Sequence, residues 1–209
     1  MYTVPRGKRL SRDERREQII EVTLDHVAEN GVRGTTLSKI AAAIDVTTPA
    51  LYAHFQNRRD ILLATIDELF ERRTLPHRYP LEGNAIERLR SLGHRHTELL
   101  GADDDKSVLA LFEFIAAPPE EGLRETMGSK ILLLVDDIAS IVREGQSEGT
   151  VRKDADPTQV AWMIVSRAWT EDITNLLGVG HEWNEERSNR MLELILDSIA
   201  ADPGDGTPA

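Results

Sequence analysis

The stretch from Thr35 to Arg58, TTLSKIAAAIDVTTPALYAHFQNR, gathers hydroxyl, aromatic and cationic side chains of the kind that bind nucleic acid. Threonine and tyrosine hydroxyls, an imidazole and a guanidinium group can all form hydrogen bonds with phosphate oxygens or base edges. The side chains left on or near the outer face of its second half are Thr47, Thr48, Ala50, Tyr52, Ala53 and His54. No other part of the 209 residues indicates a chemistry as strongly.

Two short helices joined by a tight turn would position these side chains. The first helix carries an apolar face at helical spacing, formed by Leu37, Ile40, Ala41 and Ile44. Asp45 marks the turn, because Asp tolerates left-handed backbone better than most residues. We expect Thr48 to cap the second helix, with Pro49 at its first position and with Leu51 and Phe55 facing inward. This pattern predicts a helix-turn-helix whose second helix has the size to enter a major groove.

The longer stretch from Ile19 to Leu62 resembles the N-terminal domain of the TetR family of transcriptional regulators. The matching features are Gly31, the Thr35-Thr36 pair, Ile40-Ala41, Val46-Thr47, Leu51-Tyr52, His54-Phe55 and Arg58 ahead of Ile61-Leu62. The likeness extends over roughly residues 10–70. Val27, Asp45 and Arg59 stand where the family usually has Phe, Gly and an acidic residue. None of these departures removes a DNA-facing group, although Asp45 adds a negative charge beside the turn.

Each DNA-facing side chain receives an expected role. Thr36 and Lys39, at the start of the first helix of the pair, should contact phosphate. Tyr52 should donate its hydroxyl to a phosphate, and Arg58, at the start of the following helix, is the expected phosphate anchor. His54 meets either a phosphate or a base edge. Base edges should face the N-terminal end of the second helix, which is formed by Thr47, Thr48, Pro49 and Ala50. The alternative for every one of them is a solvated surface residue.

Charge is distributed unevenly along the chain, whose formal net charge is −11. Residues 1–60 contain ten Lys or Arg and eight Asp or Glu, a balance of +2, and the remainder contains fifteen and twenty-eight, a balance of −13. The positive charge therefore lies where DNA would bind. Three cations of the N-terminal arm, Arg6, Lys8 and Arg9, either reach a minor groove or remain in solution.

Several function classes are disfavoured by composition. The chain has no cysteine, which excludes disulfides and thiol catalysis. It has no apolar run of about 18 residues and no secretory signal at its N-terminus, so we expect a cytoplasmic protein without a membrane partner. His94 and His96 point about 200° apart on a helix and cannot share one ion, so we expect no metal. No phosphate loop or catalytic triad is found, so we expect neither a cofactor nor an enzyme.

The periodicity predicts an all-α fold. We expect a basic flexible arm over 1–10, the helix-turn-helix domain over 11–57, a helical effector-binding and dimerisation domain over 58–201, and a disordered tail over 202–209. A capping box at Ser11–Glu14 should begin the first helix, and Gly31 should end it. The later helices are expected near residues 58–74, 84–100, 105–116, 120–146 with an interruption near Gly128, 157–177 and 184–200.

The resemblance implies a ligand-controlled regulator, most often a repressor, that binds double-stranded operator DNA as a homodimer. Specific binding by this motif uses two half-sites, which favours a palindromic operator. Candidate effector contacts are His94, His96, Phe112, Phe114, Trp162 and Trp169, with ordinary core packing as the alternative. In the family the last two helices form a four-helix bundle with a second subunit, and the candidate dimer contacts are Val160, Ile164, Arg167, Ala168, Met191, Leu194, Ile195, Ser198 and Ile199. Glu171 and Asp172 are expected on a solvated acidic face.

Three function classes are compared. The first is a regulator released from DNA by an unknown small molecule. The second is a DNA-binding activator or architectural protein without a ligand. The third is an enzyme or interaction module, which the helix-turn-helix pattern and the lack of a catalytic set disfavour. Sequence alone does not separate the first two.

Overall fold

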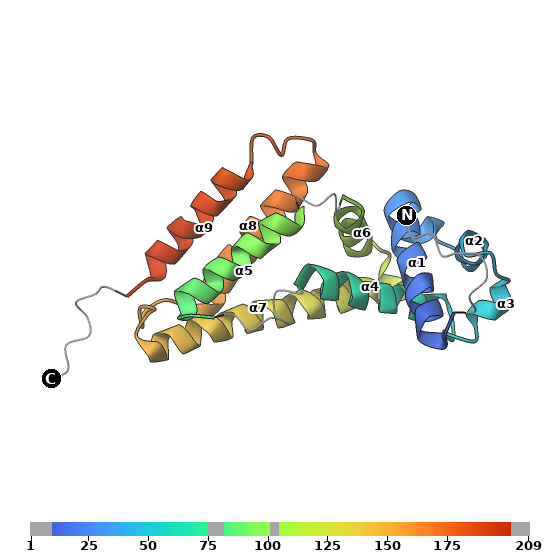
Figure 1. Ribbon diagram of the computed structural model, residues 1–209, viewed down its shortest axis with the longest axis horizontal. Coiled ribbons are helices and arrows are strands. Elements are labelled where there is room, and N and C mark those ends of the chain that lie inside the picture. The colour runs from blue at the N-terminus through green and yellow to red at the C-terminus, as the bar shows by residue number, and fades with distance from the viewer. Residues whose placement is uncertain (1–9, 75–81, 101–104, 202–209) are drawn as a thin grey trace. The chain divides into compact units, whose positions relative to one another are not determined.

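The computed structural model describes residues 10–74, 82–100 and 105–201, which form a succession of helices (Figure 1). The basic arm, Pro76, Pro80 and the C-terminal tail lie outside the described residues. The helices are α1 (Arg12–Gly34), α2 (Leu37–Ala43), α3 (Thr48–Leu51), α4 (Arg58–Thr74), α5 (Ala85–Leu100), α6 (Asp105–Ile115), the 3-10 turn η2 (Pro119–Glu121), α7 (Leu123–Glu148), α8 (Pro157–Leu176) and α9 (Glu185–Ile199). Within the described residues there is no strand, only an isolated bridge between Val151 and Ala200. The all-α prediction is confirmed.

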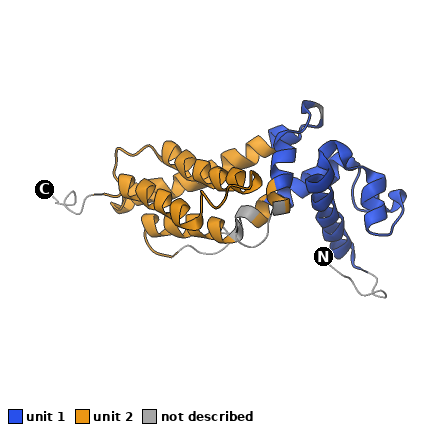
Figure 2. Cartoon of the chain, turned by 90° about the horizontal axis from the view of Figure 1, so that it is seen from above, with its two compact units in different colours: residues 1–69, 109–126 blue, residues 70–108, 127–209 orange. Residues whose placement is uncertain are grey.

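The chain divides into two compact units (Figure 2). Unit 1 comprises residues 1–69 and 109–126, and unit 2 comprises residues 70–108 and 127–209. This division does not coincide with the predicted boundary at residue 58, because most of α4 and the segment from α6 to the start of α7 lie in unit 1. In the part of the chain that is described, no helix is both long and apolar enough to cross a membrane.

In unit 1, the ends of α1 follow the sequence signals. Ser11 caps the helix with the expected box: its hydroxyl accepts from Glu14 N, and the Glu14 carboxylate accepts from Ser11 N. Gly31 leaves the helical conformation at φ 69°, a left-handed value that glycine adopts without strain. One further turn follows to Gly34, so the predicted end at Gly31 is a kink.

The core of unit 1 lies among α1, α2, α3 and α4. Its buried members are Ile19, Ile20, Ile40, Ala41, Ile44, Leu51, Phe55, Ile61 and Ala64. These side chains come from the apolar faces that the helical spacing predicts. Burying them together holds α2 and α3 against the longer helices, because an isolated four-residue helix such as α3 is not stable in water.

In unit 2, α5, α8 and α9 pack against one another in pairs. They share with α7 an apolar core that includes Leu89, Val142, Ala161, Leu192 and Leu196, each with essentially no exposed surface. Asp156 caps α8 by accepting from Thr158 N and Gln159 N, and Pro157 takes the first helical position as predicted. The interruption expected in α7 is absent: the helix runs unbroken through Gly128.

Candidate nucleic-acid interface

The turn between α2 and α3 is held by backbone hydrogen bonds. Asp45 N donates to Ala42 O at 3.2 Å and Val46 N donates to Ala41 O at 3.0 Å. Asp45 has φ 54°, the predicted left-handed conformation. The cap of α3 lies one residue earlier than predicted: Thr47 is the cap, Thr48 begins the helix, and the Thr47 side chain makes no capping hydrogen bond.

The second helix of the motif has a buried and an open side. Leu51 and Phe55 are buried in unit 1. The open side carries Thr47, Pro49, Ala50 and Tyr52, the last with 54% of its surface exposed, while Thr48 is half-buried. A tyrosine that exposes this much ring and hydroxyl on an otherwise well-packed unit is available for a partner. The arrangement therefore places the predicted base-edge residues and Tyr52 where DNA could meet them.

Two further predicted phosphate contacts lie at the start of α2. Thr36 is the N-cap of this helix: its Oγ1 accepts from Lys39 N at 3.4 Å and lies 3.0 Å from Ser38 Oγ. Lys39 is exposed, and its ammonium group donates to Gly34 O at 2.9 Å. An ammonium group has three donors, so this bond leaves Lys39 able to approach a phosphate.

His54 lies just beyond α3 and is half-buried. Burial lowers its pKa, and the positive charges of Arg12, Arg15 and Arg16 lower it further. His54 is therefore neutral near pH 7. Arg16 also donates to His54 O at 3.2 Å, and its guanidinium carbon lies 4.1 Å from the centre of the Phe55 ring. Sequence reasoning missed this contact between α1 and the residues that follow α3, although the arginines near the start of α1 were a signal for it.

Arg58 was expected to anchor a phosphate, and the structure gives its guanidinium group partners within unit 1. Nε donates to Thr35 O at 2.6 Å, Nη2 donates to Val32 O, and Nη1 donates to Glu121 Oε2 at 2.7 Å. The side chains of Arg58 and Glu121 are each only 25% exposed. A phosphate at this position would compete with acceptors that the protein already supplies.

The predicted dimer residues divide between two faces of α8 and α9. Five of them, Val160, Ile164, Arg167, Ile195 and Ile199, are buried inside the subunit, and Ala168 is half-buried. The apolar stripe that we assigned to the interface therefore packs the chain's own core, and its buried side chains are not available to a partner subunit. Met191, Leu194 and Ser198 are exposed. Further large apolar side chains are exposed on or just after α8: Trp162, Met163, Ile173, Leu177 and Val179.

The predicted effector residues do not form one group. Phe114 is fully buried and Phe112 half-buried, both on the part of α6 that belongs to unit 1. His94 and His96 are half-buried on α5 of unit 2, and Trp169 packs against the unit 2 core. Trp162 is 39% exposed. Within the described residues, no group of three or more His, Asp or Glu side chains is arranged to hold a metal ion.

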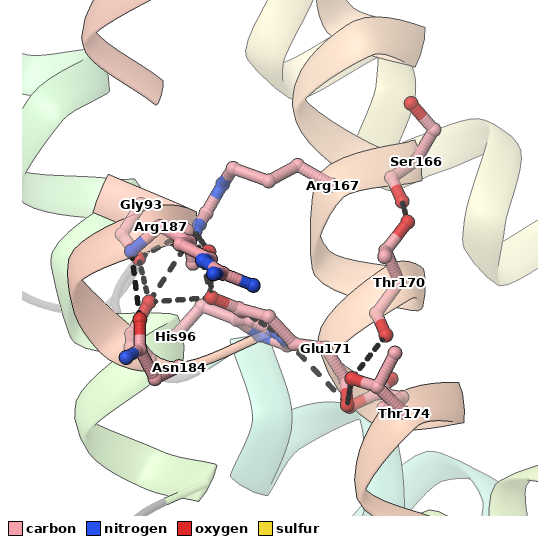
Figure 3. Close-up of polar contacts among 12 residues, drawn as sticks. Gly93, His96, Ser166, Arg167, Thr170, Glu171, Thr174, Asn184 and Arg187 are labelled. Carbon is pink, nitrogen blue, oxygen red and sulfur yellow. Dashed lines mark hydrogen bonds and ion pairs between the residues drawn. The ribbon is translucent and has the colours of Figure 1, made fainter. Parts of the chain in front are cut away.

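A buried polar network joins α5, α8 and α9 in unit 2 (Figure 3). Arg167 donates to Glu171 Oε1 at 2.9 Å, to Gly93 O at 2.9 Å and to the Ser188 hydroxyl, and Thr97 donates to Glu171 Oε1 at 2.9 Å. Burial lowers the pKa of Arg167, and the Glu171 carboxylate opposes this shift.

The network also overturns an expectation about the acidic residues of α8. Glu171 and Asp172 are buried, so the expected solvated acidic face is wrong. His96 Nε2 approaches both carboxylates, at 3.4 Å from Glu171 Oε2 and 3.8 Å from Asp172 Oδ1. Helical spacing placed Arg167 on the stripe assigned to the dimer interface. Arg167 and Glu171 form an i,i+4 pair on α8, but the sequence did not show that this pair is buried inside the chain's own core.

Comparison with known proteins adds independent information. A family model described as "Bacterial regulatory proteins, tetR family" matches residues 19–65. The "Fatty acid metabolism regulator protein" of Bacillus subtilis is 25% identical over 187 residues, which cover 87% of this chain and 94% of that protein. The repressor KstR2 of Mycolicibacterium smegmatis is 24% identical over 205 residues, which cover 91% and 93%. A crystal structure of a TetR-family regulator from Rhodococcus sp. superposes with a TM-score of 0.71 at 23% identity, over 90% of this chain and 100% of that one.

Proposed function

The chain belongs to the TetR family of transcriptional regulators, and we propose that it is a homodimeric repressor that binds a palindromic operator and leaves it when a small molecule binds. The observation that carries the DNA-binding part is the two-sided α3. Leu51 and Phe55 fix the helix to the unit 1 core, while Thr47, Pro49, Ala50 and Tyr52 are left open to solvent. A short helix that presents its N-terminal end in this way can read base edges in a major groove.

In this proposal the phosphate contacts come from residues around α3. Thr36 and Lys39 at the start of α2 and the exposed Tyr52 hydroxyl bind the backbone on either side of the groove. His54 is proposed to face either a phosphate or a base edge. Such contacts orient the protein, and Pro49 and Ala50 supply apolar contact with thymine methyl groups.

The homodimer is proposed from the open apolar face of α8 and α9. Six large apolar side chains there are between 37% and 69% exposed: Trp162, Met163, Ile173, Leu177, Met191 and Leu194. A set of this size on neighbouring helices of one unit is a typical interaction surface. A symmetric pair of subunits would bury the same face twice. It would also bring two copies of the helix-turn-helix domain, residues 11–57, which we call the reading head, to two half-sites.

The effector is proposed to be a fatty acid or a closely related metabolite that binds in unit 2. This part rests on the name of the Bacillus subtilis relative, to which the chain is similar over most of its length. Purified protein should therefore show a higher melting temperature with long-chain fatty acids, because a ligand of the native state stabilises it. A panel without any shift, together with unchanged DNA affinity, would favour the ligand-independent activator or architectural protein.

DNA binding is tested by selecting duplexes from a random-sequence pool with the full chain. We expect selected duplexes to contain two related half-sites in inverted orientation. Lys39→Ala should weaken binding and lower the slope of log affinity against log salt by about one per bound subunit. Lys153→Ala is the matched control, because it removes an exposed lysine from unit 2. Equal effects of the two substitutions, or selection of no duplex, would refute the proposed DNA surface.

A further inference from the structure

The segment between α6 and α7 is bonded to the reading head through the first two residues of α4. Glu121, the last residue of η2, accepts from Arg58 Nη1 at 2.7 Å through its carboxylate and from Arg59 Nε at 2.7 Å through its backbone carbonyl. The two arginines and Glu121 belong to the same compact unit although more than sixty positions separate them in sequence. The short turn η2 is thus part of unit 1, which also contains the helix-turn-helix.

The other bonds of Arg58 reach the junction between α1 and α2. Its Nη2 group donates to the carbonyl oxygen of Val32, in the last turn of α1. Its Nε group donates to the carbonyl oxygen of Thr35, directly before the α2 cap. A cation at a helix C-terminus is favourable because the carbonyl groups there carry partial negative charge. Thr35 itself is fully buried. One guanidinium group therefore connects the end of α1, the start of α2 and η2.

The planar guanidinium group is suited to this connection. Its five donors lie in a rigid fork, so fixing Nη1 against a carboxylate also fixes the directions of Nε and Nη2. The Arg58–Glu121 pair is largely shielded from water, and Glu121 places a negative charge near the positive N-terminal end of α4. Without the carboxylate, the guanidinium group would keep only the two carbonyl acceptors and could turn away from them toward solvent.

We propose that Glu121 is a positioning residue for DNA binding: its carboxylate holds Arg58 against the Val32 and Thr35 carbonyl groups and thereby fixes the start of α2, and neither Glu121 nor Arg58 touches DNA. The inference rests on the proposed DNA-binding function and assigns Arg58 a different role from the phosphate anchor expected from sequence. The start of α2 matters because Thr36 and Lys39 lie there and because α2 carries α3 through the tight turn at Asp45.

The sign of the effect distinguishes this role from simple electrostatics. Glu121→Gln removes one negative charge, and that change alone would raise affinity for DNA. A positioning role for Glu121 predicts the opposite: affinity for DNA should fall by about 3- to 10-fold, which lies within the range for residues that act on a site without contacting its ligand. Glu125→Gln is the matched control, because Glu125 lies four residues later and is exposed, and the substitution removes the same charge.

The experiment measures the affinity of the full-length wild-type and variant proteins for a duplex selected by the wild type, with folded fractions checked by circular dichroism. We expect Glu121→Gln and Arg58→Lys each to weaken DNA binding with an unchanged salt slope. The double variant should lose no more affinity than the single variant that binds DNA more weakly. Glu125→Gln should bind as wild type or slightly better. If Glu121→Gln does not fold, Glu121→Asp keeps the charge, shortens the reach and should weaken binding in the same direction.

Three results would overturn the inference while leaving DNA binding intact. The first is a Glu121→Gln protein that binds as well as or better than the wild type. The second is a Glu121→Gln protein that melts at a lower temperature but, once folded, binds DNA with undiminished affinity. That result would indicate a purely structural role for Glu121. The third is a salt slope that falls by about one per bound subunit in Arg58→Gln, which is the behaviour of a phosphate contact. Failure of the wild type to select any duplex would instead refute the proposed function, and the inference with it.

Discussion

Replacing Gly93 with alanine is expected to lower the stability of the protein, although alanine usually stabilises a helix. Gly93 lies in the interior of α5, where alanine is normally preferred to glycine by about 1 kcal/mol. A Cβ atom at this position would lie 2.5 Å from Leu192 Cδ2 and 3.2 Å from Arg167 Nη2. Leu192 is fully buried in the unit 2 core, so its side chain could shift only against other core side chains. The helix-propensity gain and the steric cost therefore oppose each other.

The steric cost should exceed the propensity gain. Overpacking a well-packed core by one methyl group typically costs 1–3 kcal/mol, roughly, against the gain of about 1 kcal/mol. The same methyl group would also press on the guanidinium group that donates to Gly93 O at 2.9 Å and thereby strain the buried Arg167–Glu171 pair. We expect Gly93→Ala to destabilise the protein by roughly 0.5–2 kcal/mol and to lower its melting temperature by a few degrees.

Gly128 supplies the matched control for the same substitution. It lies inside α7, and among the described residues a Cβ atom there would meet no atom within 4 Å apart from its chain neighbours and the backbone of its own helix. Gly128→Ala should therefore stabilise the protein by roughly 0.5–1 kcal/mol. Thermal and urea unfolding of both variants at one protein concentration provides the measurement. Stabilisation of similar size in both variants would refute the reasoning, because it would mean that the core around Leu192 yields without cost.

Three other substitutions test separate parts of the structure. Asp45→Gly should raise stability by roughly 0.5–1 kcal/mol in thermal unfolding, because glycine adopts the left-handed φ of 54° without the Cβ penalty, and a lower melting temperature would contradict this. Leu194→Glu should yield monomers in analytical ultracentrifugation, whereas Leu132→Glu, at a side chain of equal exposure on α7, should leave the mass unchanged; the reverse result would move the proposed interface. The Arg90 guanidinium group lowers the pKa of Glu193, so this pair stabilises the fold above the ordinary carboxyl pKa and its contribution is lost as the pH falls through the lowered value. Glu193→Gln should flatten that part of the stability–pH curve, and an unchanged curve would show that the pair contributes nothing.

Local rules predicted several helix ends and turns in both units. The capping box at Ser11, the left-handed conformation at Asp45 and the Asp156–Pro157 start of α8 were predicted from residue type alone, and the structure confirms them. Each depends on one side chain or on two a few residues apart, which is why sequence reveals it. The shift of the α3 cap from Thr48 to Thr47 shows the limit, because two adjacent threonines offer equivalent signals.

The faces of α8 were harder to assign. Helical periodicity identified Val160, Ile164 and Arg167 as one stripe, and that stripe exists. Periodicity does not say whether a stripe meets the chain's own core or a partner, and here it meets the core. The open apolar side chains on the opposite face were not chosen for the interface, because Trp162 is predicted as a candidate effector contact and Ile173 has no predicted role. Arg167 and Glu171 are an i,i+4 pair within α8. The bonds of Arg167 to Ser188 and Gly93 depend on three helices coming together, which no local pattern encodes.

Arg58 shows that a local inference can give the charge of a partner without giving its source. A cation at the beginning of a helix, beside backbone N–H groups, indicates an anion, and the sequence predicted that anion to be a DNA phosphate. The structure supplies an anion there, but it is the carboxylate of Glu121, 63 positions later in the chain. Charge and helix polarity specify the sign of the partner and not its source, whereas the two additional bonds of Arg58 to Val32 and Thr35 depend on how α1 ends. In our proposal Glu121 fulfils this electrostatic requirement from within the protein, so DNA affinity depends on the Arg58–Glu121 contact although DNA touches neither residue.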